Sequence, residues 1–318
     1  MNMDNEALWE HAYSQHKKYL ISLIFRMTGS LSETEEIVHD AFIELLHTDL
    51  DLIRSPRSWL TKVCINKTLN HMKLAYKNRE MYPGVWLPDE IPESLIDWNN
   101  NHENISIETE IIRSESLTTS FLLLAENLSP EQRCVYILKE IFDYTFKTIS
   151  DLVSKDEAAC RKIFQRSKEA LMNFEKKFSL PPENAQSKIL EFFEHAKSGN
   201  IKGLETILTT NPELFGDGGG KVSAAGYVEG IDQVIKFMIH LGTSEIFNSP
   251  SYIFEYHQVS SRPGAVISER LQDGSWELNT VLSFEFLDGK IARIYGQRNP
   301  EKLASLFSHS SKTTKFPS

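Results

Sequence analysis

Cysteine is scarce in this sequence, and the residue spacing that most zinc sites require is absent. The 318 residues include three cysteines, Cys64, Cys134 and Cys160, with no CxxC and no paired cysteine and histidine spacing. The three lie far apart, each in an apolar and helical context. We therefore predict that they are reduced core residues of a cytosolic protein, and we expect neither a metal ion nor a cofactor.

Long apolar runs are also lacking. The first residues, MNMDNEALWEHAYSQHKK, are polar and amphipathic and do not contain the apolar run of a signal peptide. No stretch approaches the ~20 apolar residues that are needed to span a bilayer. We therefore expect a cytoplasmic protein that does not enter a membrane.

Positive charge is in short supply, with 34 lysines and arginines against 44 acidic residues and a net charge of -10. This balance argues against non-specific coating of nucleic acid, so any contact should be confined to patches. The exception is residues 54–80, which hold seven basic residues and one acidic residue. Their apolar spacing predicts a helix whose outer face carries Lys62, Asn66, Asn70 and Lys73. Cations there suit phosphates and asparagine amides suit base edges, although a solvated, lysine-rich helix is the alternative on charge alone.

Two further helices are predicted before this segment, over residues 4–27 and from Ser32 onward. Ser32 has Glu35 three residues later, which is the spacing of a capping box. The outer face of this second helix is acidic, through Glu33, Glu35, Glu36, Asp40 and Glu44. A solvated face is one interpretation of that charge, and a docking surface for a basic partner is the other.

The character of the chain changes after Tyr82. Three of its twelve prolines fall between Pro83 and Pro92, and eight acidic residues lie between Asp89 and Glu115 against one basic residue. This composition predicts a linker. Trp86, Leu87 and Trp98 are large apolar groups that a free linker would not need, so we expect them to pack against another part of the protein.

Residues 116–178 are predicted to be helical again. Ser129 should cap a helix that begins with Pro130, and a short helix from Tyr144 to Leu152 is followed by a tight turn and a long helix. This order, with a basic and polar leading face on the long helix, is typical of a helix-turn-helix that reads the major groove. Two packed helices with a solvated basic face are the alternative. The residues of that face are Lys155, Arg161, Lys162, Gln165, Arg166 and Lys168.

The last part of the chain has a different pattern. Helices are expected near residues 185–198 and 201–209, followed by strands at 252–258, 265–271, 281–287 and 291–295, with hairpin turns at Asp273-Gly274 and Asp288-Gly289. We predict an α+β domain with a curved antiparallel sheet. The turn GDGGGK at 216–221 lacks the spacing of a phosphate loop, so we interpret it as a tight turn that needs positive φ angles. Four acid or base candidates are scattered through the domain without a telling spacing: Asp217, Glu255, His257 and Glu269.

Taken in order, several segments resemble a bacterial extracytoplasmic-function (ECF) sigma factor of RNA polymerase. The subgroup is the one, often called ECF41, that carries a C-terminal SnoaL-like domain of the NTF2-like superfamily. ETEEIVHDAF resembles the acidic helix that holds the polymerase clamp, and SPRSWLTKVCINKTLN resembles the segment that opens and reads the downstream promoter element. LSPEQRCVYILKEIFDYTFKTISDLVSKDEAACRKIFQRSKEAL resembles the helix-turn-helix that reads the upstream element. WLPDE, DGGGK and NPEKL resemble the three signature motifs of the subgroup.

The resemblance implies a fold class of two all-α sigma domains, σ2 and a helix-turn-helix σ4, followed by an α+β, cone-shaped NTF2-like domain. Its expected boundaries are 1–82 for σ2, 83–115 for an acidic linker that mimics RNA, 116–180 for σ4, 183–305 for the SnoaL-like regulatory domain and 306–318 for a tail. The implied partners are core RNA polymerase, through its β′ and β subunits, and promoter DNA. The free protein is expected to be a monomer and not an enzyme. The alternative is a ligand-binding or enzymatic NTF2-like domain attached to a DNA-binding helical module.

The resemblance also assigns roles to individual residues. Polymerase binding falls on Glu35, Glu36 and Asp40. DNA binding falls on Arg57, Trp59, Lys62, Asn66, Lys67, Asn70, Lys73, Lys155, Arg161, Lys162, Gln165 and Arg166. Interdomain regulation falls on Trp86, Leu87, Pro88, Asp217, Gly218, Gly219, Gly220, Lys221, Asn299 and Pro300.

Two expectations follow for the C-terminal domain, which is taken to act as a fused regulator and could hold an unknown small molecule. Trp86 and Leu87 should bury against it near residues 217–221. The segment SSRPG, at 260–264, departs from the Asn-Gly-x-Pro turn expected of the family. The resemblance therefore gives no prediction for the rim of a cavity at this place.

Overall fold

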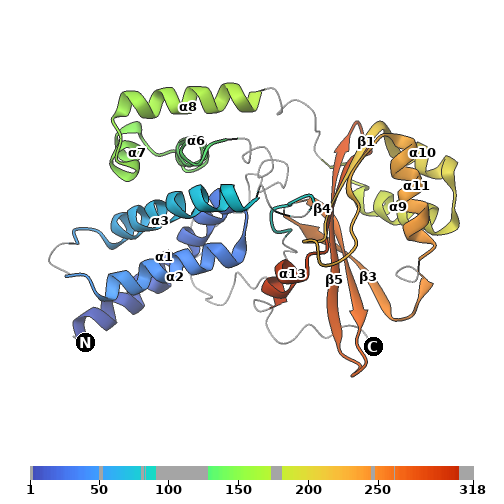
Figure 1. Ribbon diagram of the computed structural model, residues 1–318, viewed down its shortest axis with the longest axis horizontal. Helices are drawn as coiled ribbons and strands as arrows, with labels where there is room; N and C mark the ends of the chain where they lie inside the picture. The colour runs from blue at the N-terminus through green and yellow to red at the C-terminus, as the bar shows by residue number, and fades with distance from the viewer. Residues whose placement is uncertain are drawn as a thin grey trace. The chain divides into compact units, whose positions relative to one another are not determined.

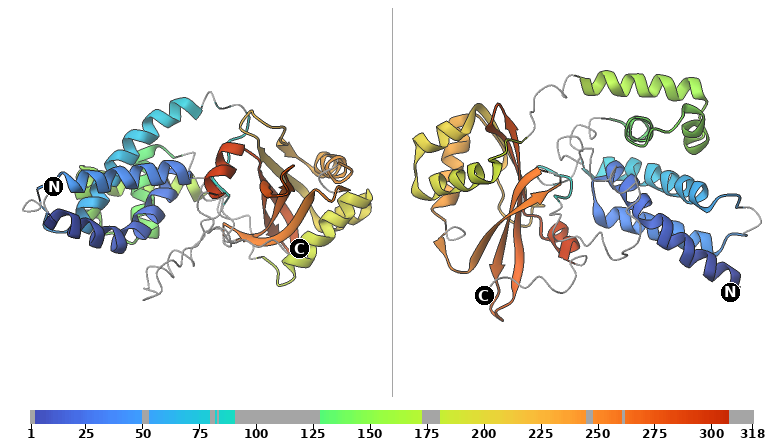
Figure 2. Two further views of the ribbon diagram at one scale, coloured as in Figure 1. Left: turned by 90° about the horizontal axis from the view of Figure 1, so that it is seen from below. Right: turned by 180° about the vertical axis from the view of Figure 1, so that it is seen from behind.

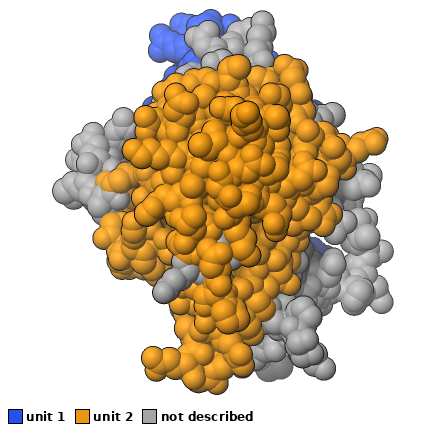
Figure 3. Space-filling model, turned by 90° about the vertical axis from the view of Figure 1, so that its right-hand side faces the viewer, with its two compact units in different colours: residues 1–81, 104–175 blue, residues 82–103, 176–318 orange. Residues whose placement is uncertain are grey.

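The computed structural model describes residues 3–49, 53–79, 82, 84–90, 128–172, 181–244, 248–260 and 262–307. The chain forms two compact units, coloured separately in Figure 3. Unit 1 is Met1–Met81 with Asn104–Glu175, and unit 2 is Tyr82–Glu103 with Lys176–Ser318. The start of the predicted linker therefore belongs to the same unit as the C-terminal domain.

Unit 1 begins with three helices that pack side by side, α1 (Met3–Thr28), α2 (Leu31–Leu46) and α3 (Pro56–Arg79) (Figure 1). Each contributes an apolar stripe at helical spacing to one core, as the sequence predicts. The most deeply buried members include Leu20, Leu23, Ile24, Phe42, Leu60 and Ile65.

The start of α2 differs from the prediction. Ser30, not Ser32, is the N-cap, in an extended conformation with its hydroxyl accepting from the backbone N–H of Glu33. Gly29 precedes it at φ 69°, a left-handed conformation that ends α1 and turns the chain. The capping box expected of Ser32 and Glu35 is therefore wrong, because the helix starts two residues earlier.

The second group of helices in unit 1 consists of α6 (Pro130–Tyr136), the π-helical segment η2 (Ile137–Ile141), α7 (Phe146–Val153) and α8 (Glu157–Met172). The cap predicted at Ser129 is confirmed. Its hydroxyl accepts from the N–H of Gln132 at 3.3 Å, while the Gln132 side chain accepts from the N–H of Ser129 at 3.0 Å. The predicted short helix, turn and long helix are also confirmed, with Ser154 at φ 54° forming the turn between α7 and α8.

Buried polar and aromatic contacts join the two helical groups of unit 1. Arg133 on α6 is buried and donates to the backbone carbonyl of Met27 at the end of α1, at 2.7 Å. The rings of Tyr19 and Phe142 meet edge to face, with centroids 5.8 Å apart, and the hydroxyls of Tyr19 and Tyr144 share a hydrogen bond. A cation buried in this way is expensive to leave unpaired, so these contacts fix the packing of one group on the other.

Unit 2 is an α+β domain built on one six-stranded sheet. Its elements are α9 (Ala185–Ser198), α10 (Ile201–Ile207), β1 (Leu208–Asp217), β2 (Gly226–Glu229), α11 (Ile231–Gly242), β3 (Tyr252–Val259), β4 (Arg262–Arg270), β5 (Trp276–Leu287), β6 (Lys290–Gln297) and α13 (Pro300–Phe307). The strand order is β2-β1-β6-β5-β4-β3. Figures 1 and 2 show α9, α10 and α11 together on one side of the sheet and α13 on the other.

The predicted architecture, a helical N-terminal part followed by an α+β domain, is confirmed, but the sheet contains more than the sequence indicated. The four predicted strands, β3 to β6, pair in antiparallel fashion as expected, but β1 adds a parallel pairing with β6. Strands β1 and β2 and helix α11 were not predicted. Asn211-Pro212 lies inside β1 beside an irregularity in its register with β6. Such a bulge accommodates proline, which cannot donate to the ladder.

The two faces of the sheet have different chemistry. Along β5, Leu282, Phe284 and Phe286 belong to the apolar core shared with α9 and α11, while Ser283 and Glu285 alternate with them and face the other side. The hairpin at Asp288-Gly289 is confirmed, since both residues have positive φ, 50° and 73°, as a two-residue turn of this kind requires. On the polar face, Glu285 pairs with Arg262 at 2.9 Å.

Candidate nucleic-acid interfaces and linker site

The cationic face predicted for α3 is present in the structure. Lys62, Asn66, Asn70 and Lys73 are all exposed and project from the same side of the helix. Lys73 lies 3.9 Å from Glu131, a loose contact between partly exposed groups. Exposed amides between exposed ammonium groups can approach a nucleic-acid strand without first breaking a buried contact.

Three other residues assigned to DNA on α3 are placed differently. Arg57 and Trp59 are half-buried, and the Arg57 guanidinium lies 4.6 Å from the centroid of the Tyr19 ring. Lys67 points to α2, where its ammonium group lies 3.3 Å from Glu44 and 3.9 Å from Asp40. Lys67 therefore neutralises part of the acidic face of α2 and does not share the outer face of α3.

The acidic face of α2 remains the strongest negative feature of these helices. Glu36 and Asp40 are exposed and Glu35 is half-buried. The opposite side of α2 buries Ile37, Ala41 and Phe42 in the core. The helix therefore presents carboxylates on a rigid scaffold, as a docking surface for a basic partner would.

The helix-turn-helix carries its polar side chains outward on α8. Arg161, Lys162, Gln165 and Arg166 are exposed, while Cys160 and Ser167 face the interior. Arg161 pairs with Glu157 at 3.1 Å and lies 4.5 Å from the centroid of the Phe146 ring. Lys155 precedes the helix and lies 3.1 Å from Glu131. The exposed face of α8 therefore carries three cations and the amide of Gln165.

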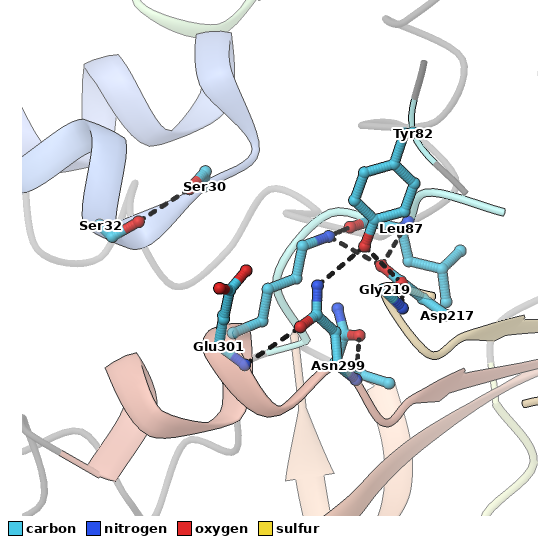
Figure 4. Close-up of polar contacts among 10 residues, drawn as sticks. Ser30, Ser32, Tyr82, Leu87, Asp217, Gly219, Asn299 and Glu301 are labelled. Atoms are coloured by element: carbon cyan, nitrogen blue, oxygen red, sulfur yellow. Dashed lines mark hydrogen bonds and ion pairs between the residues drawn. The ribbon is translucent and has the colours of Figure 1, made fainter. Parts of the chain in front are cut away.

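In unit 2, one buried carboxylate, Asp217, contacts the chain at both Tyr82 and Leu87. Figure 4 shows Asp217 at the end of β1 with donors on both of its oxygens. Oδ1 accepts from the Tyr82 hydroxyl at 2.6 Å and from the Gly219 N–H at 2.9 Å. Oδ2 accepts from the Leu87 N–H at 3.1 Å and from the Lys302 ammonium group at 2.8 Å. We call Asp217, Tyr82, Leu87 and Lys302 the latch.

Lys302 on α13 and Asn299, which precedes α13, make further contacts around the latch. Lys302 also donates to the carbonyl of Leu87, and its ammonium group lies 4.4 Å from the centroid of the Trp86 ring. Asn299 donates to the Tyr82 hydroxyl at 2.8 Å and accepts from the N–H of Glu301 at 3.0 Å. Burial, followed by the hydrogen bond to Asp217, raises the pKa of Tyr82. The tyrosine therefore remains a hydrogen-bond donor throughout the neutral range.

A second buried contact holds the end of the segment. Arg262, at the start of β4, lies 3.3 Å from Glu90 and 2.9 Å from Glu285, and all three are buried. Its guanidinium lies 4.8 Å from the centroid of the Tyr295 ring. Arg262 falls within SSRPG, so the departure from the expected turn supplies the cation that Glu90 contacts.

Several of the residues assigned to interdomain regulation are buried. Leu87, Pro88, Asp217 and Asn299 are buried, and Trp86 is half-buried. The burial expected of Leu87 beside residues 217–221 is confirmed. Gly219 needs to be glycine, because a Cβ there would lie 2.5 Å from the Asn299 side chain at φ 63°. Gly218 and Gly220 belong to the same turn. Lys221 pairs with Glu301, and Pro300 is the first residue of α13.

Four participants were missed by sequence reasoning: Tyr82, Glu90, Arg262 and Lys302. Two of them carried a signal, because Glu90 ends WLPDE and Lys302 lies within NPEKL. Tyr82 and Arg262 had none, since their partners lie 135 and 172 residues away in the chain. The rest of the predicted linker, residues 91–115, and Trp98 with it, lies outside the described residues.

The four acid and base candidates are not gathered in one site, although Glu255 and His257 are neighbours on β3. Asp217 is occupied in the latch, and Glu269 accepts from Asn279 at 2.8 Å. Glu255 and His257 lie 4.0 Å apart on β3, and burial lowers the pKa of His257. Within the described residues, no three histidine, cysteine, aspartate or glutamate side chains gather as a metal site.

The cysteines are placed as predicted. All three are free and buried, and burial raises the pKa of the Cys64 thiol to about 12. A thiol in that condition is a packing group and not a nucleophile at neutral pH. Among the described helices, none is long and apolar enough to cross a membrane.

Comparison with known proteins identifies the helical part. Residues 12–76 match the family model Sigma-70 region 2, and these residues form most of α1, all of α2 and most of α3. The ECF RNA polymerase sigma factor SigJ of Mycobacterium tuberculosis (strain ATCC 25618 / H37Rv) is 26% identical over 227 residues, 71% of this chain and 70% of that protein. Over these residues the chain is similar to extracytoplasmic-function sigma factors.

Two further comparisons extend the relation. The probable ECF sigma factor SigI of the same strain is 26% identical over 211 residues, 65% of this chain and 68% of that protein. The crystal structure of SigJ superposes with a TM-score of 0.69 at 22% identity and covers 93% of this chain and 97% of that one. The multi-domain fold, helical regions followed by an α+β domain, is therefore shared with that structure along nearly the whole chain.

Proposed function

We propose that this chain directs RNA polymerase to specific promoters and that its NTF2-like domain controls this activity through the latch. The observation that carries the first part is the match of residues 12–76 to Sigma-70 region 2, because those residues form α1–α3 with an exposed cationic face. Sigma factors are transcription initiation subunits, and no enzymatic activity is proposed for either unit.

Two DNA contacts with different chemistry support promoter recognition. The α3 face offers Asn66 and Asn70 amides between two lysines, which suits an unpaired strand whose base edges are accessible. The α8 face offers Arg161, Lys162, Gln165 and Arg166, which suits the major groove of duplex DNA. The first contact would read and hold the opened downstream element, and the second would read the upstream element.

The polymerase contact is assigned to α2. Glu35, Glu36 and Asp40 would meet a basic surface of the β′ subunit, and the linker would approach the β subunit. A net charge of -10 is compatible with DNA binding if most of the surface faces polymerase and only two patches face DNA. The free protein would be a monomer in the cytoplasm, organised as σ2, linker, σ4, regulatory domain and tail within the boundaries predicted above.

Control by the latch is inferred from the residues that unit 2 holds in place. Trp86 to Glu90 lie in the first part of the linker, and the contacts with Asp217, Lys302 and Arg262 hold them on unit 2. The part of the linker that is held there would not be able to lie in a channel of polymerase at the same time. Formation of the complete initiation complex would therefore require the latch to open, or the latched domain to take a defined place on polymerase.

In vitro transcription with core polymerase tests this function. Full-length protein and a form ending near residue 182 are compared on a promoter selected by the full-length protein. Promoter-dependent initiation by either form supports the proposal. If both forms fail to associate with core polymerase and neither supports initiation, the proposal is wrong.

A further inference from the structure

Two buried carboxylates, one from the linker and one from the sheet, contact the same arginine in unit 2. Oε1 of Glu90 lies 3.3 Å from Nη2 of Arg262, and Oε1 of Glu285 on β5 lies 2.9 Å from Nη1. The side chains of Glu90, Arg262 and Glu285 are 0%, 5% and 6% exposed. We call Glu90 and Glu285 the carboxylate pair. If all three groups were ionised, this buried cluster would hold one negative charge in excess.

The neighbouring strands do not balance that charge with the groups that the structure describes. Arg293 on β6 lies 3.9 Å from Glu285, but its Nε is engaged by Glu213 on β1. The hydroxyl of Tyr295, also on β6, donates to Oε2 of Glu285 at 3.2 Å and brings no charge. The two guanidinium groups at this place therefore face three carboxylates.

The segment 86–90 adds negative charge and not positive charge. Asp89 precedes Glu90 and is buried as well. Lys302 of α13, which contacts this segment at Leu87, is engaged by the carboxylate of Asp217 at 2.8 Å. Its charge therefore serves the latch and leaves the excess at Arg262 in place.

An excess buried charge is costly, and a proton on one of the two carboxylates removes it. Burial raises the pKa of Glu285, although Arg262 and Arg293 act in the opposite direction. Two acids in contact with one cation titrate as a unit, so the proton belongs to the pair and not to one member.

We propose that the carboxylate pair holds one proton while the segment 86–90 is bound, and that release of this proton to water frees Glu90 from Arg262. Glu285 is fixed, because β5 is paired on both sides, with β4 and with β6. Glu90 lies outside helices and strands, so it is the partner that can move away. Arg262 and Glu285 then remain as a balanced ion pair.

The direction of the pH effect follows from where the proton is held more tightly. The bound segment is stabilised most below the ordinary pKa of glutamate, ~4.3, and this stabilisation is lost as the pH rises through the higher pKa of the closed pair. A fall in pH would therefore fasten the linker to unit 2. The consequence for transcription rests on the proposed control by the latch. The proton itself is measured on the free protein, so a failure here would leave promoter recognition standing.

Carbon NMR of the glutamate carboxyl groups in the full-length protein, followed over pH, tests for the shared proton. We expect the signals of the pair to titrate clearly above the ordinary ~4.3. Glu90→Gln leaves Arg262 with a single carboxylate, so this raised titration should disappear. Glu285→Gln should have the same effect and serves if the first variant does not fold. Glu191→Gln, at an exposed position on α9, is the matched control and should leave the raised titration in place.

Hydrogen exchange of the Leu87 amide, which donates to Asp217, reports the opening. Its protection, corrected for the intrinsic effect of pH on exchange, should fall by up to ~tenfold per pH unit while the pair loses its proton. In Glu90→Gln the protection should stay constant over the same range and exceed that of the unchanged protein at the alkaline end, because glutamine is neutral like the protonated acid. Ordinary titration of every glutamate, a raised titration that survives both glutamine variants, or constant Leu87 protection through the raised titration would each overturn the proposal.

Discussion

Asp217 takes two hydrogen-bond donors on each carboxylate oxygen, and one of the four is the ammonium group of Lys302. It lies in the interior, with no exposed surface. A carboxylate can satisfy all four because it only accepts, whereas an amide would place its own donor against two others. The latch therefore depends on a charge at this residue and not only on its shape.

Asp217→Asn should open the latch. The variant loses the ion pair with Lys302 and sets an amide N–H₂ against two donors. Breaking a buried charge pair costs about 3–5 kcal/mol. We expect hydrogen exchange of the Leu87 amide to accelerate by ~100-fold or more, since each 1.4 kcal/mol corresponds to about tenfold. Exchange measured by NMR at Leu87 reports this directly.

Asp232→Asn is the matched control, because Asp232 is exposed in the first turn of α11 and the same change there should leave Leu87 unaffected. Tyr82→Phe removes one neutral donor and should have a smaller effect, about fivefold, for the ~1 kcal/mol of a typical hydrogen bond. Unaltered exchange at Leu87 in Asp217→Asn would mean that the segment is held by packing alone.

At the scale of elements, α3 and α8 present different chemistry to DNA, and variants on each should fail in different ways. Lys62→Ala and Asn66→Ala alter exposed side chains on the outer face of α3. Contacts to single-stranded bases contribute about 1–3 kcal/mol each. We expect promoter opening, followed by permanganate reactivity of unpaired thymines, to fall roughly tenfold while binding to the closed promoter persists. A loss of closed-complex binding with normal opening would contradict the assignment.

Helix α8 should behave as a duplex-binding element. Arg166→Glu places a carboxylate on its exposed leading face and should lower the affinity for promoter DNA. It should also reduce the slope of log affinity against log salt by about 1, because one fewer phosphate contact releases fewer counterions. Lys202→Glu, an equal charge change on the exposed side of α10, is the control that should not alter the slope. Equal slopes for Arg166→Glu and the unchanged protein would favour a solvated face.

Elements whose signal is local were predictable, and those set by distant pairing were not. Helix α1, the cap at Ser129 and the hairpin at Asp288-Gly289 depend on neighbouring residues, and the sequence indicates each of them. Strand β1 was missed because its partner β6 lies about 80 residues away and pairs with it in parallel. Parallel strands are not joined by a tight turn, so no turn motif in the sequence marks the pair. Helix α11 was missed although Val234, Ile235 and Met238 are spaced to share a buried face.

The same distinction applies to the sites. The cationic faces of α3 and α8 arise from residues three and four apart, so the sequence indicates them directly. Lys67 satisfies the same spacing rule only loosely and turns to Glu44 instead. The latch needs Tyr82, Asp217 and Lys302 in one place. Only the motif resemblance pointed there, and it indicated Asp217 but not its two partners.

For the whole molecule, the latch matters because it ties the start of the linker to the C-terminal domain. Trp86 lies against the Lys302 ammonium group, and Leu87 lies on Asp217. Removing the Trp86 ring should loosen this hold without reaching the cores of unit 1. The consequence should appear in transcription, and only when the NTF2-like domain is present.

Trp86→Ala should therefore change promoter activity in the full-length protein by several-fold and leave the form ending near residue 182 unaltered. Lys302→Met removes the other half of the same contact and should reproduce the effect in the full-length protein. Combined with Trp86→Ala it should add little, because contacting residues are coupled. Run-off transcription with core polymerase measures all four proteins, and circular dichroism checks that each is folded. An equal effect of Trp86→Ala in the full-length and shortened proteins would place the role of this tryptophan on polymerase and not in the latch.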